Sequence, residues 1–290
     1  MMIWRLSVIS LLSFFAMPIR AEETVDVGNA EVVIELYDRW RFAEAERALD
    51  DLRQKYPGQP ETLFAEGYER FLSGAYAEAA ARLRAAGVGM PTKELLRLVE
   101  GAQASIEGHE ERRSQHFVIR FPPEDAVLAD YALDTLEAAT AALGTDLGFV
   151  PPRLIPVDIL RSPADLALVT ALTVDDVERT GTIAVSKWGR IMLTTPRAMR
   201  LGYAWQDSLA HELVHYAVAY ATHDRAPVWL QEGLAKFLEH RWRRPPGLDL
   251  TPSLQHLLAK ALASGRLISF ESMHPSMAKE IGRASCRERV

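Results

Sequence analysis

Cysteine is almost absent from this chain of 290 residues, since Cys286 is the only one. It lies within residues 281–290, which resemble translated sequencing-adapter DNA. We expect this tail to be foreign and the natural chain to be truncated near Glu280. The natural part then has no thiol for catalysis, metal binding or disulfide formation.

Basic residues are in deficit, with 33 Lys and Arg against 39 Asp and Glu and a formal net charge of −6. Residues 1–21 and the tail at 281–290 each carry a net charge of +2, so removing both leaves −10. An acidic body argues against nucleic acid or anionic lipid as a partner.

Hydrophobic runs long enough for a membrane span, which takes about 20 apolar residues, are also lacking. The most apolar stretch, residues 6–19, is interrupted by serines and Pro18. It follows Arg5 and ends before the small Ala21, an arrangement typical of a secretory signal peptide. We therefore expect residues 1–21 to be cleaved and the protein to be exported, periplasmic or secreted, with no stable membrane insertion afterwards.

Residues 22–112 are predicted to form an all-α domain, because Ala, Leu, Glu and Arg recur there at helical spacing. An offset of 34 residues pairs Tyr37 with Phe71, Phe42 with Tyr76, Glu44 with Glu78, Ala45 with Ala79, Leu49 with Leu83 and Pro57 with Pro91. This pattern resembles tetratricopeptide repeats. Two repeats and one further helix are few for a free-standing array, so we expect it to dock onto the next domain and to offer a surface to a protein partner.

Residues 113–280 are predicted to form an α+β domain. Strands are expected at 116–121, 155–160 and 191–195, and helices at 124–143, 204–221 and 228–241. The charged residues 110–113 are interpreted as a solvated linker.

The motif His211-Glu-Leu-Val-His215 lies in an apolar-periodic segment that is predicted to be a buried helix. A spacing of four residues places both imidazoles on one helix face, where they could bind one Zn²⁺. Glu212 beside them could act as general base toward a water molecule. A catalytic zinc needs a third protein ligand, and Glu232 stands at the start of the following predicted helix.

The sequence Trp229-Leu-Gln-Glu232-Gly-Leu-Ala235 after this motif resembles the gluzincin peptidases, including peptidase-MA-like domains fused to tetratricopeptide repeats. The resemblance implies an α+β zincin-like catalytic domain with a tetratricopeptide-like helical domain before it. It implies that His211, His215 and Glu232 bind Zn²⁺, that Glu212 is catalytic, and that a protein or peptide is hydrolysed. It also implies a sheet whose edge strand pairs with the substrate, a role that we assign to residues 191–195.

Two features depart from the gluzincin pattern. Lys236 stands where some members carry an acidic partner for a zinc-binding histidine, so another residue must orient that histidine. No residue matches the Tyr or His that stabilises the oxyanion, and His240, His256 and His274 are candidates by position alone.

Other interpretations of the same residues stay open to different degrees. A metzincin would require glycine and histidine in place of Val218 and Ala221, so that class is excluded. Asp224 or Glu239 could replace Glu232 as the third ligand, although neither lies in the gluzincin context. Two other functions remain, namely an inactive zincin and repeat scaffold that binds envelope proteins, and a zinc amidase that acts on peptidoglycan peptides.

Overall fold

The computed structural model describes residues 30–87, 89–170, 172–247, 250 and 252–267. The predicted signal peptide, the predicted foreign tail and His274 lie outside the described residues. The described chain combines helices with one mixed sheet. Within it, no helix is both long and apolar enough to cross a lipid bilayer.

Five helices make up residues 30–105, which we call the helical segment. They are α2 (Ala30–Asp38), α3 (Phe42–Lys55), α4 (Pro60–Leu72), α5 (Tyr76–Ala86) and α6 (Met90–Ser105). Turns of a few residues join them, and α2 packs on α3, α4 on α5, and α5 on α6. The predicted helical hairpins are therefore confirmed, whereas their tetratricopeptide character stays a prediction.

Positions related by the 34-residue offset have equivalent environments. Ala45 and Ala79 are both fully buried, one turn into α3 and α5. Helices α4 and α5 approach so closely that a Cβ atom on Gly67 would lie 2.7 Å from Cγ of Leu83. Small residues thus permit close helix packing in both hairpins.

The sheet has the strand order β1-β2-β3-β5-β4. Its strands are β1 (Glu110–Arg113), β2 (Phe117–Phe121), β3 (Ile155–Leu160), β4 (Ala184–Lys187) and β5 (Arg190–Thr194). The central strands β2, β3 and β5 run parallel, and β1 and β4 pair antiparallel at the two edges. Residues 110–113 therefore form a strand rather than a linker, and the sheet begins slightly before the predicted boundary at 112/113.

The predicted assignment of the edge strand to residues 191–195 is wrong. That stretch forms β5, which pairs with β3 on one side and with β4 on the other. Trp188 and Gly189 have positive φ angles of 54° and 68°, as a tight two-residue hairpin requires, and they return the chain from β4 into β5. Strand β4 is consequently the edge strand beside the motif helix.

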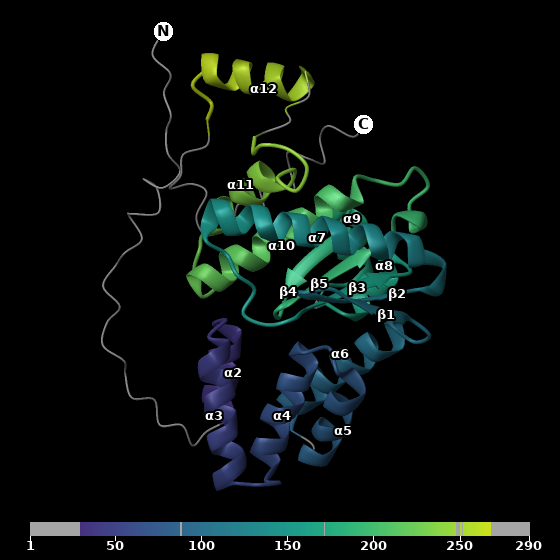
Figure 1. The fold of residues 1–290 in the computed structure, drawn as a ribbon, viewed down its shortest axis with the longest axis vertical. Coiled ribbons are helices and arrows are strands. Elements are labelled where there is room, and N and C mark those ends of the chain that lie inside the picture. Colours follow the sequence, from purple (N-terminus) through teal and green to yellow (C-terminus); the bar gives the residue numbers. More distant parts are fainter. Residues whose placement is uncertain (1–29, 88, 171, 248–249, 251, 268–290) are drawn as a thin grey trace, which may run out of the picture.

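Six further α-helices follow in the part of the chain that the structure describes. They are α7 (Ala126–Leu147), α8 (Pro163–Leu168), α9 (Val174–Thr180), α10 (Trp205–Thr222), α11 (Val228–Leu238) and α12 (Pro252–Ala263). Helices α7 and α10 pack together against the sheet, while the helical segment lies toward its opposite face (Figure 1). We call residues 110–247 the sheet domain.

A buried polar cluster joins the helical segment to the sheet domain. Tyr76 of α5 donates a hydrogen bond of 2.5 Å to Asp158 of β3 and accepts one from Arg190 of β5. Arg120 of β2 forms an ion pair of 2.7 Å with Asp158 and donates to the carbonyl oxygen of Gly74. Because Asp158 pairs with Arg120, and Arg190 donates to Tyr76 and to the carbonyl oxygen of Val169, burial of these groups is tolerated. The predicted docking of the two parts is confirmed.

Candidate metal centre

Helix α10 carries two histidines with their ring nitrogens directed to one point. The Nε2 atoms of His211 and His215 lie 3.1 Å apart, one helical turn from each other. Both side chains are largely buried, at 21% and 16% exposure. The buried face of α10 packs on the sheet and on α7, so the two rings are held against the free edge of β4.

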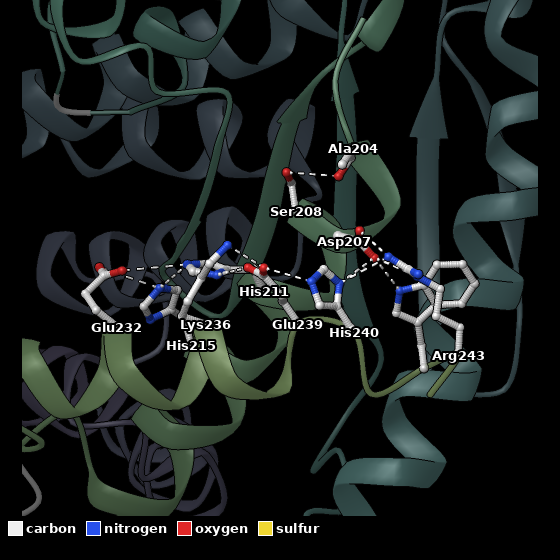
Figure 2. A network of polar contacts seen from close by, with 11 residues as sticks. Ala204, Asp207, Ser208, His211, His215, Glu232, Lys236, Glu239, His240 and Arg243 are labelled. Atoms are coloured by element: carbon white, nitrogen blue, oxygen red, sulfur yellow. Dashed lines mark hydrogen bonds and ion pairs between the residues drawn. The ribbon is translucent and has the colours of Figure 1, made fainter. Parts of the chain in front are cut away.

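Helix α11 brings Glu232 to the same point. His223 and Asp224, with positive φ angles of 52° and 55°, turn the chain after α10, and Pro227 precedes the first residue of α11. The Glu232 carboxylate oxygens then lie 3.7 Å from Nε2 of His211 and 3.7 Å from Nε2 of His215 (Figure 2).

The donor atoms of His211, His215 and Glu232 all lie within 4.8 Å of one another, and no other such group of three occurs among the described residues. Tetrahedral coordination with bonds of about 2.0 to 2.1 Å separates neighbouring donors by about 3.3 Å. The two imidazole nitrogens lie 3.1 Å apart, and each lies 3.7 Å from a different oxygen of Glu232, so the separations are close to that value. Two imidazoles and one carboxylate form a donor set that suits Zn²⁺.

Glu212 lies between the metal-binding face of α10 and strand β4. It accepts a hydrogen bond from the backbone N–H of Ser186, and only 9% of the residue is exposed. Burial raises the pKa of Glu212 to about 7, although His211 and Ser186 counteract the shift. A carboxylate that titrates near neutral pH can accept a proton and return it, which is what a general base requires.

A second carboxylate, Glu239, orients His211 from behind. Its Oε2 atom lies 3.2 Å from Nδ1 of His211, and its other oxygen accepts from Lys236 (Figure 2). Burial alone would lower the pKa of His211, but the adjacent Glu232 and Glu239 carboxylates outweigh it and raise this pKa to about 9. Glu239 is therefore placed as a partner of His211, one of the predicted metal ligands, rather than as the alternative ligand, and it occupies the orienting position that Lys236 left open.

None of the described histidines proposed for oxyanion stabilisation lines the site. His240 lies behind it, with its ring 3.1 Å from Asp207 and 3.3 Å from Glu239. His256 is exposed on α12, a helix without buried residues. Asp224, the other alternative ligand, lines a neighbouring cavity but does not join the donor group.

Two cavities meet at the candidate metal ligands, and both include Glu212, His215 and Glu232 in their walls. The inner cavity, of about 590 Å³, extends along β4 to Trp188 and reaches the helical segment. The outer cavity, of about 450 Å³, extends from the same residues toward Gly181. Together the two cavities form one groove along the free edge of β4. The candidate metal ligands lie in its middle, where the two cavities meet.

The site contains features that sequence reasoning missed. The N–H of Ser186 and the whole of β4 belong to it, and the one local signal for that hairpin is the glycine at position 189.

Comparison with protein-family models, with curated proteins and with solved structures finds no match for this chain.

Proposed function

We propose that the protein is an exported zinc metallopeptidase of the gluzincin type, with a zincin-like sheet domain and a tetratricopeptide-like helical segment. The observation that carries the proposal is the meeting of His211, His215 and Glu232 at one point, with the buried Glu212 carboxylate beside them. The secretory pattern of residues 1–21 supports export.

The proposed chemistry is hydrolysis of a peptide bond. A Zn²⁺ ion held by the three ligands would supply a Lewis acid and lower the pKa of a water molecule toward about 7. Glu212 takes the proton from the attacking water and delivers it to the leaving nitrogen. Its contact with the Ser186 N–H fixes the carboxylate between the helix and the edge strand.

Strand β4 offers the backbone groups for an extended substrate. The carbonyl oxygen of Ile183 accepts from Thr194 of β5, so by alternation the backbone groups of Ala184 and Ser186 face the free edge. The Ser186 N–H donates to Glu212 there, which leaves the Ser186 carbonyl and both groups of Ala184 to pair with a substrate. Both residues line the groove. A peptide that adds to this edge lies with its backbone beside Glu212, which supports cleavage of peptides over other amides.

Zinc content tests the site, and turnover tests the activity. We expect one tightly held zinc per chain of residues 22–280, and weakened or lost zinc in a Glu232→Ala variant. A Glu212→Gln variant should retain zinc and lose peptide cleavage, because it removes the base and leaves the ligands. A folded protein without zinc would contradict the proposed site, and cleavage retained by Glu212→Gln would remove Glu212 from the mechanism.

A further inference from the structure

The groove along β4 ends differently on its two sides. The walls of the outer cavity come from the sheet domain alone, including Gly181, Thr182 and Ser208. The walls of the inner cavity include five residues of the helical segment: Tyr37, Asp38, Trp40, Tyr68 and Leu72. The helical segment therefore bounds one end of the groove.

Aromatic contacts fix this boundary in place. Trp188, at the end of β4, packs edge-on against Phe71 of α4 with ring centroids 5.5 Å apart. Trp40, just after α2, packs edge-on against Tyr216 of α10 at 4.9 Å. The turn after β4 and the motif helix thus both contact the helical segment, and Trp40 and Trp188 line the inner cavity there. We call this side of the groove its closed end.

Carboxylates predominate at the closed end. Asp38 and Asp224 line it, together with one cation, Lys187. Burial raises the pKa of both carboxyl groups, a hydrogen bond from Tyr68 opposes the rise at Asp38, and Lys187 and Arg39 oppose it at both groups. Partly desolvated carboxylates favour a neighbouring cation over an anion.

Strand direction connects this charge to one end of a peptide. Strand β4 runs from Ala184 to Lys187, toward the closed end. A peptide that pairs antiparallel with β4 therefore runs away from the closed end, and its amino terminus lies beside Asp38 and Asp224. A cavity of about 590 Å³ is within the range that encloses a small ligand or a short chain end.

We propose that the inner cavity binds the free amino terminus of the substrate, so that the enzyme removes residues from the amino-terminal end of peptides. This inference rests on the proposed peptidase function. The helical segment acts as the end wall of the groove, and Asp38 and Asp224 pair with the terminal ammonium group.

The test uses hexapeptides of varied sequence, each made in three forms. The first has both termini free, the second has an acetylated amino terminus, and the third has an amidated carboxyl terminus. Cleavage by the zinc-loaded full chain is followed by mass spectrometry, and binding of the same peptides is measured on the zinc-loaded Glu212→Gln variant. We expect acetylation to lower kcat/KM and binding at least tenfold, and amidation to change neither appreciably. Products should be released from the amino-terminal end.

An Asp224→Asn variant should reduce the penalty for acetylation to about twofold or less. Asparagine tolerates the left-handed conformation of residue 224, so this change is not expected to disturb the turn. Glu35→Gln is the matched control, because Glu35 is exposed near Asp38 but does not line the cavity, and its penalty should equal that of the wild type.

Binding separates failure of the inference from failure of the proposed function. Equal binding of free and acetylated peptides, or a penalty caused by amidation instead, overturns the inference even if peptides are cleaved. Tighter binding of the free amine without any cleavage supports the assignment of the inner cavity to the amino terminus and contradicts the peptidase activity.

Discussion

The Nδ1 atom of His211 lies 3.2 Å from Oε2 of Glu239, while Nε2 of the same ring lies 3.7 Å from Glu232. One carboxylate thus contacts each nitrogen of this imidazole (Figure 2). A carboxylate at Nδ1 fixes the ring orientation and leaves the Nε2 lone pair for a metal.

Removal of the carboxylate in a Glu239→Ala variant should weaken zinc binding by about 10- to 100-fold, the usual cost of losing such a partner. Competition with a chromophoric chelator measures the affinity. Lys236→Ala is the matched control, since Lys236 contacts the other oxygen of Glu239 and no metal ligand, and it should have a smaller effect. Equal zinc affinity in Glu239→Ala and wild type would show that His211 is oriented by something else.

The sequence predicted the parts of the site that depend on local spacing. His211 and His215 one turn apart need only a helix, and strand β3 was predicted with its observed bounds, Ile155–Leu160, although Asp158 interrupts its apolar residues. Glu239, the residue that caps the carboxyl end of α11, lies seven residues after Glu232, two turns further along the same face. Which carboxylate faces the ligand nitrogens and which lies behind them depends on how α11 docks on α10, and that is not a local property.

Strand β4 shows a second reason why prediction from sequence was incomplete. Its four residues, Ala184–Lys187, contain one long aliphatic side chain and no extended alternation, so the pattern is too short to identify a strand. The edge position follows from pairing with β5, a contact that only the folded chain reveals.

Proline substitutions in β4 test which backbone groups face the groove. Ser186→Pro removes an N–H that points to the free edge and contacts Glu212, so the protein should fold but lose most peptide cleavage. Val185→Pro removes an N–H on the side of β5 and with it a hydrogen bond of the sheet, so it should lower the free energy of unfolding by about 1 to 3 kcal/mol. Circular dichroism melting and peptide cleavage distinguish the two, and the opposite ranking in stability would contradict the assigned edge.

A Tyr76→Phe substitution tests the junction between the helical segment and the sheet domain. Loss of the hydroxyl removes hydrogen bonds with Asp158 and Arg190 in a site where Tyr76 is 2% exposed. We expect the free energy of unfolding to fall by about 1 to 3 kcal/mol, measured by urea denaturation. Tyr56→Phe, at a residue that is 48% exposed, should change it by less than about 0.5 kcal/mol. We expect the helical segment and the sheet domain to unfold together, because this cluster joins them. Two separate unfolding transitions in the wild type would contradict that expectation.

His109, between α6 and β1, should make the protein less stable in mild acid. Burial and the nearby Arg161 lower the pKa of this imidazole to about 4 from an ordinary value of 6.5, and both ring nitrogens lack hydrogen-bond partners among the described residues. Because the unfolded chain binds the proton more readily, stability is full above pH 6.5 and is lost as the pH falls from 6.5 toward 4.

Urea denaturation at pH 7 and pH 5 measures this loss. A His109→Leu variant removes the titrating group, so its stability should fall by about 1 kcal/mol less than that of the wild type over this interval, after allowance for solvent screening at a half-buried site. His256→Leu, at an exposed position on α12, is the matched control and should follow the wild type. If His109→Leu loses as much stability as the wild type, the imidazole is not the group that couples folding to protons in this range.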